Sequence, residues 1–412
     1  MNRTILALIF SITILRAEGD LQVRGEFNPR FLLDWDREFI GIPYRLLRLD
    51  VNSSHEDVSG TIALDFEYRP RTNSVDLNLQ EAYVMYNHGP GEFSVGKQIV
   101  VWGSADGNNP TDNVNPYNYY YMFLAGADRK IGKIMIREEL YYQDFTLSLV
   151  ASPFFAPDRL PINDPDLPLF SPPFDIFDSL IGTPETSLEN SEFGARLHLG
   201  MPVGEVALSY FDAYDRKFLP EITMQMSPVP TLRVDRLTYY RNRVLGMETV
   251  GLWRDFALRM EGAYFFTEDL DGDKPFVRNN YVQYVGQVDW NAPGRTMLIL
   301  QYLGMTSLGK EDDMDFIDKM PPGMGAVFCG FARSAVMAVA KKDLGDAPHK
   351  LEARALYDFD MEGYMLGGSI DLSPADAFYI TLGINYFDGP SGSMFNALHH
   401  FSHLLLAGKY SF

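Results

Sequence analysis

Apolar and polar residues alternate with a period of two along most of this chain. In FALRMEGAYFF (256–266), Leu258 and Met260 lie on one face of a strand, and Arg259 and Glu261 lie on the other. The same period recurs at residues 193–200, 281–290, 295–302, 351–360 and 378–387. Successive side chains of a strand point to opposite faces, whereas an amphipathic helix repeats every 3.6 residues. The sequence therefore predicts an all-β protein.

Short polar turns alternate with longer connections along the chain. Short connections are predicted near residues 52–57, 87–91, 143–144, 201–204, 254–255, 291–295, 343–349 and 373–376. The other class is predicted at residues 28–41, 69–74, 102–129, 153–190, 214–243, 267–277, 305–328, 360–363 and 388–398. If each class occupies one rim, the chain forms an antiparallel up-and-down barrel of about 18 strands that begins at residues 21–27. Loss of one hairpin to a long loop would leave about 16 strands.

The two faces of these strands differ in chemistry. The apolar face carries aromatic residues near strand ends, as in the interfacial girdles of membrane barrels: Tyr264, Phe266, Tyr284, Trp290, Tyr357, Phe359, Tyr386, Tyr410 and Phe412. The other face carries both signs of charge: Asp65, Glu67, Arg196, Arg259, Glu261, Asp289, Glu352, Arg354 and Asp358. So many charges in a dry core would carry a large desolvation cost. We therefore predict a transmembrane β-barrel whose apolar face meets lipid, with these nine charged residues lining a water-filled pore.

The N-terminus has the composition of a secretory signal. Arg3 precedes an apolar stretch at 5–15 and a small-residue cleavage site, Ala17-Glu18-Gly19. We expect residues 1–19 to be a signal peptide and residues 20–412 to form the barrel; a buried N-terminal helix is the alternative. No later apolar run approaches the roughly 20 residues that a membrane helix needs.

Charge and cysteine content exclude several partners and sites. The formal net charge of −20, from 55 acidic and 35 basic residues, argues against nucleic acid as a partner. A single cysteine, Cys329, leaves no internal disulfide framework and no Cys-rich metal site.

The C-terminal segment LLLAGKYSF (404–412) places Leu404, Leu406, Tyr410 and the terminal Phe412 on one strand face. A barrel in lipid must pair its last strand with its first, because an open edge leaves amides unsatisfied. This segment resembles the C-terminal signal of bacterial outer-membrane β-barrels. The resemblance implies residence in the outer membrane, contact with lipid and lipopolysaccharide, and insertion by the barrel assembly machinery, with Tyr410 and Phe412 as the assembly signal.

The segment 95–123 contains the pattern W-G-x-x-D-G-x-N-P-T-D-x-x-N-P, which begins at Trp102. It is similar to a segment of some porin-like outer-membrane proteins. Asn and Asp before Pro make stiff turns, because Pro fixes its own φ and keeps its predecessor out of the helical region. One interpretation is an inward-folded loop at 102–129 that narrows the barrel, with acids beside tyrosines at the constriction: Trp102, Asp106, Asp112, Tyr117 and Tyr119. The alternative is an exposed extracellular loop.

The segment 153–190 is rich in proline and phenylalanine. An exposed outer loop is favoured for it, because proline-rich segments are commonest as spacers. The alternative is an inward plug or lid with an apolar surface for a substrate.

Motifs for catalysis or metal binding are weak. Residues 268–274 and 311–318 are acidic, but the first lacks the final Glu of a calcium loop, and both read as solvated outer loops. His399, His400 and His403 do not converge on one metal if they lie on a strand. Ser402 and His403 would face opposite sides of a strand, which separates them as a catalytic pair. We expect no catalytic, cofactor or metal site.

The functional expectation is a pore-forming outer-membrane protein for passive or selective diffusion of small polar solutes. A barrel of 16–18 strands is wide enough for an aqueous channel unless loops fill it. A plugged ligand-binding transporter or adhesin without an open channel is the main alternative. An outer-membrane hydrolase and a secreted array of β-sandwiches are further ones. A homo-oligomer is left open, because no sequence feature marks a subunit face.

Overall fold

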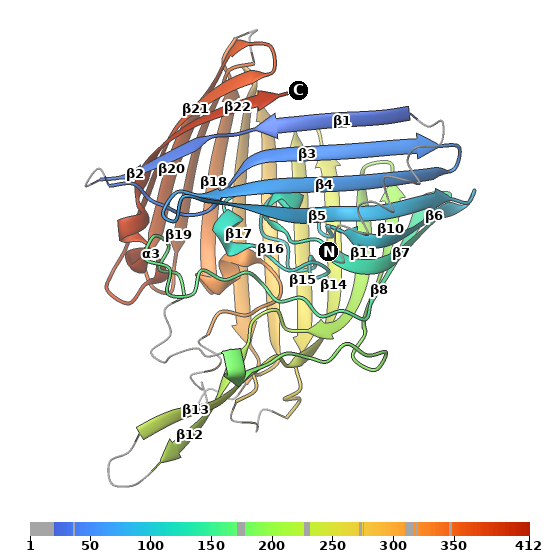
Figure 1. The fold of residues 1–412 in the computed structure, drawn as a ribbon, viewed down its shortest axis with the longest axis vertical. Coiled ribbons are helices and arrows are strands. Elements are labelled where there is room, and N and C mark those ends of the chain that lie inside the picture. Colours follow the sequence, from blue (N-terminus) through green and yellow to red (C-terminus); the bar gives the residue numbers. More distant parts are fainter. Residues whose placement is uncertain are drawn as a thin grey trace.

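One antiparallel sheet closes on itself to form a β-barrel (Figure 1). The computed structural model describes residues 20–35, 38–170, 178–225, 231–271, 274, 276–309, 317, 320–345 and 348–412; the predicted signal segment 1–19 lies outside them. The first barrel strand is interrupted and consists of β1 (Asp20–Phe27) and β2 (Arg30–Asp34), which both pair with the last strand, β22 (His403–Ser411). Counted in this way, the described residues form a barrel of eighteen strands, as the sequence predicts.

The remaining barrel strands follow the chain around the wall. They are β3 (Tyr44–His55), β4 (Val58–Arg69), β5 (Ser74–Asn87), β6 (Gly91–Gln98), β7 (Lys133–Tyr142), β8 (Phe145–Ser152), β10 (Glu192–Met201), β11 (Gly204–Tyr214), β14 (Arg241–Trp253), β15 (Phe256–Phe266), β16 (Tyr281–Ala292), β17 (Thr296–Ser307), β18 (Ser334–Asp343), β19 (Lys350–Asp358), β20 (Tyr364–Ala375) and β21 (Phe378–Asp388). A separate small sheet contains β9 (Ile181–Gly182), β12 (Leu219–Gln225) and β13 (Thr231–Thr238). Its hairpin β12–β13 projects beyond the barrel in Figure 1.

Among the described residues, the named helical segments are few and short. They are η1 (Tyr119–Tyr121), η2 (Gly126–Arg129), η3 (Asp178–Leu180), η5 (Val327–Gly330), α3 (Met394–Ala397) and η6 (His399–Phe401). No helix among the described residues is long and apolar enough to cross a bilayer.

The long connections all lie at one rim, which also carries two short ones, 70–73 and 359–363; the other rim carries short turns only. The β3–β4 and β14–β15 turns, for example, place only two residues between consecutive strands, whereas residues 99–132 connect β6 to β7. Short turns are periplasmic and long loops extracellular in bacterial outer-membrane barrels. We therefore call the rim with the long loops the outer rim.

The side chains of β15 show which way the faces point. Leu258 and Met260 are 47% and 60% exposed on the outside, whereas Glu261 and Phe265 are 3% and 0% exposed on the inside. Apolar residues outside and charged residues inside are the arrangement of a barrel in lipid, the reverse of a soluble sandwich.

The last strand closes the barrel through its final residue. The Phe412 N–H donates to the Gly25 carbonyl at 2.9 Å, and the Gly25 N–H donates to the Phe412 carbonyl at 2.8 Å. With the pairs Glu26–Ser411 and Phe27–Tyr410, these bonds join the last strand to the first, as expected from the sequence.

Candidate functional site: a plugged lumen with two cavities

Residues 99–132, the inward loop, fold into the barrel. Asn108, Asp112 and Asn115 are each at most 1% exposed. Asn115 accepts the Val100 N–H at 2.8 Å and donates to the Ile131 carbonyl at 2.9 Å. Side chains thus satisfy backbone groups that have no strand partner here, and this is why an Asn- and Asp-rich segment can be buried.

The wall strand β15 holds the tip of this loop. Glu261 accepts the N–H groups of Ser104 and Ala105 at 2.6 and 2.5 Å, and it also accepts a hydrogen bond from Thr111 at 3.0 Å. Arg259, two residues away, donates to the Ser104 carbonyl at 2.8 Å. The acidic side chain of Glu261 and the basic side chain of Arg259 therefore both bind the loop instead of facing open water.

A second anchor involves strands that lie close to β15 in the barrel wall. Arg216 donates to both carboxylate oxygens of Glu192, at 2.7 and 2.8 Å, and Lys133 forms an ion pair with the same carboxylate. Arg216 also reaches the carbonyls of Asn113 and Val114 at 3.4 and 3.3 Å. Two wall strands and the loop are thereby joined at one buried carboxylate.

The nine charged residues predicted to line the pore lie on the inner face, where most form ion pairs. The pairs are Arg45–Asp65 at 2.7 Å, Arg159–Glu67 at 2.7 Å, Arg196–Glu248 at 2.8 Å, Arg259–Asp289 at 2.8 Å and Arg354–Glu352 at 3.6 Å. Of the nine, Glu352 and Arg354 line an inner cavity and Asp358 an outer one.

The residues predicted at the constriction divide into two groups. Trp102 packs edge-on against Phe211. Asp112 pairs with Lys130 at 2.7 Å, and Lys130 lies over the ring of Tyr117, which packs edge-on against Tyr119. Burial raises the pKa of Tyr119 well above its ordinary value, so its hydroxyl stays protonated.

Asp106 corrects the expectation that both acids sit beside the tyrosines. Its carboxylate accepts a hydrogen bond from Gln287 of β16 at 3.2 Å, and its N–H donates to the same side chain at 2.9 Å. The chain turns at Gly107, where φ is +84°, and this turn directs Asp106 to the wall.

Residues 153–170 lie against the inward loop, although the sequence favoured an exposed loop for them. Asp158 accepts the Tyr117 N–H at 2.7 Å, and Asp164 accepts the Tyr120 hydroxyl at 2.6 Å. Arg159 joins the same segment to Glu67 of the wall. The prolines therefore stiffen a segment that covers the inward loop. Residues 171–177 of the same predicted loop lie outside the described part of the chain.

An aromatic cluster, which the sequence did not indicate, fills the lumen beside the inward loop. Phe123 lies 6.2 Å from Phe328, 5.6 Å from Phe387 and 6.3 Å from Phe401, measured between ring centroids, and Phe331 lies 5.7 Å from Phe328. These rings come from the inward loop, the η5 segment, β21 and η6. Four segments distant in sequence share no local pattern, so only the fold brings them together.

Two cavities lie on opposite sides of η5. The outer cavity has a volume of about 860 Å³ and reaches Cys329 and Phe331. The inner cavity has a volume of about 300 Å³ and is lined by Phe328 and by wall residues near the short-turn rim, including Lys341 and Glu352. The η5 segment and the aromatic cluster therefore separate an outer chamber from an inner one.

The other motifs do not assemble a site. Ser402 accepts the Phe387 N–H at 3.0 Å, and His403 lies 2.6 Å from the Phe401 carbonyl, so both are engaged with backbone. Among the described residues, no group of three or more His, Cys, Asp or Glu side chains is placed to hold a metal ion. Of the acidic stretches 268–274 and 311–318, residues 272–273, 311–316 and 318 fall outside those residues.

Solved structures share this architecture. OccK5 (OpdH) of Pseudomonas aeruginosa matches with a TM-score of 0.56 and 11% identity, over 95% of this chain and 98% of that one. Wzi, an outer-membrane protein of Escherichia coli involved in group 1 capsule assembly, matches with a TM-score of 0.51 and 12% identity, over 100% of this chain and 88% of that one. The chain has the fold of these outer-membrane β-barrels. No protein-family model and no curated protein matches the chain, and structural neighbours of such low sequence identity show its fold alone.

Proposed function

We propose that this barrel is a selective pore whose path is closed at rest by its own loops and opens for a small solute. The observation that carries the proposal is the pair of cavities that meet back to back at η5, the outer one at Cys329 and the inner one at Phe328. A modest movement of this one segment would join them into a path through the barrel.

The η5 segment is held in a way that suits a gate. The backbone N–H groups of Gly325, Ala326 and Phe328 donate to side-chain amides at 2.7, 2.8 and 3.1 Å. Such contacts are exchanged for water at small net cost. The adjoining phenylalanines make an apolar constriction, which excludes water and ions until it widens.

Single-channel recording in planar bilayers tests this proposal. We expect small, infrequent conductance steps from the wild-type protein and larger, more frequent ones from Phe328→Ala, which removes a ring from the constriction. Phe193→Ala on the lipid-facing side of β10 is the matched control and should behave like wild type. Heat-modifiable gel mobility confirms that each variant is folded.

A closed ligand-binding barrel is the second candidate, because the wall carboxylates Glu261 and Glu192 hold the inward loop at two anchors. The absence of current from both wild type and Phe328→Ala would overturn the pore and select this second candidate.

A further inference from the structure

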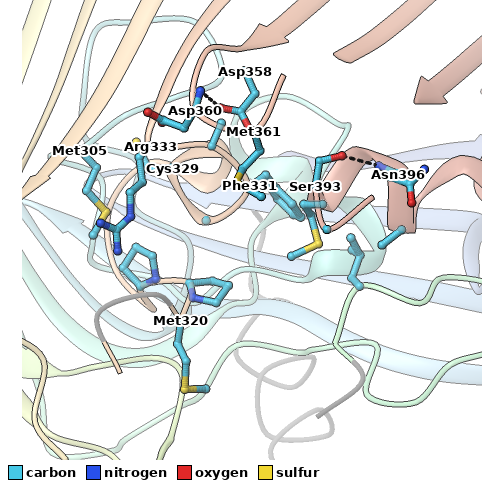
Figure 2. A pocket seen from close by; sticks show the side chains of 18 of the residues that line it. Met305, Met320, Cys329, Phe331, Arg333, Asp358, Asp360, Met361, Ser393 and Asn396 are labelled. Atoms are coloured by element: carbon cyan, nitrogen blue, oxygen red, sulfur yellow. Dashed lines mark hydrogen bonds between the residues drawn. The ribbon is translucent and has the colours of Figure 1, made fainter. Parts of the chain in front are cut away.

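The outer cavity has a predominantly apolar wall. Four methionines and three prolines contribute to it (Figure 2): Met305, Met320, Met361, Met394, Pro168, Pro321 and Pro322. Phe331 adds a ring to the same wall. Methionine side chains are flexible and polarisable, so such a wall adapts to ligands of irregular shape. A volume of about 860 Å³ lies within the range of small-molecule sites.

One polar group at this wall is incompletely satisfied. Asp358, at the end of β19, is 0% exposed, and its Oδ1 accepts the Asp360 N–H at 3.0 Å (Figure 2). Its Oδ2 has no hydrogen-bond partner among the described residues. A buried carboxylate oxygen without a donor carries an uncompensated desolvation cost, so a ligand that supplies a donor is stabilised by binding there.

The charges around the cavity favour a particular ligand. The described lining residues that carry charge are Asp358, Asp360 and Arg333, with a formal sum of −1. A ligand with one positive charge brings the formal charge of the occupied cavity to zero. An anion would make that charge more negative, and a dication would make it positive. A hydrogen bond from an ammonium group to a carboxylate is also stronger than one from a neutral hydroxyl.

We propose that the outer cavity binds a monocationic amphipathic amine, with the ammonium on Asp358 Oδ2 and the apolar body against the methionine and proline wall. This assignment rests on the proposed function, because it names the solute class that the pore would select. The cavity itself is present whether or not the barrel conducts.

Calorimetric titration of the full-length protein in amphipol tests the site without requiring a current. The probes are 2-phenylethylammonium, 2-phenylethanol and 3-phenylpropanoate, which share a ring and differ in charge. We expect the ammonium to bind most tightly and the carboxylate most weakly. Asp358→Asn should weaken ammonium binding by about tenfold or more and leave binding of the alcohol nearly unchanged.

Two further variants complete the design. Glu362→Gln removes the same charge from an exposed turn residue outside the cavity lining and should leave all three affinities unchanged. Met361→Trp narrows the cavity while the Asp358 carboxylate is retained, and it should weaken binding of every probe, so the site is tested even if Asp358→Asn misfolds.

Equal affinity for the ammonium and the carboxylate would overturn the site, as would unchanged ammonium affinity in Asp358→Asn. Selective ammonium binding by a protein that never conducts would keep the site and remove the pore. Conductance by a protein that shows no preference for the ammonium would keep the pore and remove the site.

Discussion

Glu261 of β15 accepts the backbone N–H of Ser104 at 2.6 Å, and this contact ties the inward loop to the barrel wall. The same carboxylate also accepts hydrogen bonds from Ala105, Asn109 and Thr111. A residue that the sequence identifies as a lumen charge therefore serves as an anchor for the element that fills the lumen.

Glu261→Ala should release the tip of the inward loop, because several buried donors lose their acceptor at once and each costs about 1–3 kcal/mol. We expect larger and noisier conductance steps in bilayers than wild type gives. Glu205→Ala, which removes an inner-face carboxylate paired with His198, is the control and should leave the steps unchanged. Unaltered conductance in Glu261→Ala, with the fold intact, would contradict the anchoring role.

Glu192→Gln should destabilise the barrel strongly. Arg216 and Lys133 both lie against this carboxylate, and all three side chains are at most 2% exposed. Loss of the negative charge leaves two buried cations, a change that typically costs about 3–5 kcal/mol. Urea unfolding in lipid vesicles measures this loss.

The control is Glu138→Gln, because Glu138 is partly exposed and faces His88 at 2.7 Å. Its cost should stay below about 1 kcal/mol, as is usual for exposed pairs. Equal losses in the two variants would show that burial of the Glu192 cluster is not what stabilises it.

Gly25→Val should impair closure of the barrel. A Cβ at residue 25 would lie 2.2 Å from the ring of Phe412, so the ring has to leave the seam. We expect a loss of about 1–3 kcal/mol, as for other overpacked sites, and a smaller heat-modifiable fraction after refolding into vesicles. Gly286→Val is the matched control, because a Cβ there meets nothing within 4 Å. A refolded fraction equal to that of the control would rule out a role for this packing.

The attachment of residues 153–170 should weaken as pH rises towards neutrality. Burial raises the pKa of Asp158 to about 7 from its ordinary 3.8, against the opposing effect of Lys217. The attached state therefore holds the proton more tightly than the released state, and its stability is lost as pH rises from about 4 to about 7.

Protease cleavage within residues 153–170 reports this attachment. The cleavage rate of wild type should increase with pH over that range, after correction for the protease's own profile. Asp158→Asn keeps an acceptor for the Tyr117 N–H and should flatten the increase. A pH dependence that persists in the variant would assign it to another group.

Strand-level features were predictable because they are local. Alternation at Leu258 and Arg259 specifies which side of β15 meets lipid, and the terminal Phe412 marks the closing strand. The connections could be ordered by length, since two-residue turns and long loops differ in composition. The proline content of residues 153–170 predicts an exposed spacer, because composition indicates that a segment is stiff but not where it lies.

The sequence by itself determined the strands, the direction of their faces and the closed barrel, because a period of two and a sealed edge are properties of neighbouring residues and of the backbone. Only the tertiary structure decided what fills the barrel. Phe123, Phe328, Phe387 and Phe401 meet because the closed wall brings their segments together, and Asp358 is fully buried only in the folded barrel. Contacts between segments hundreds of residues apart leave no periodic trace in the chain.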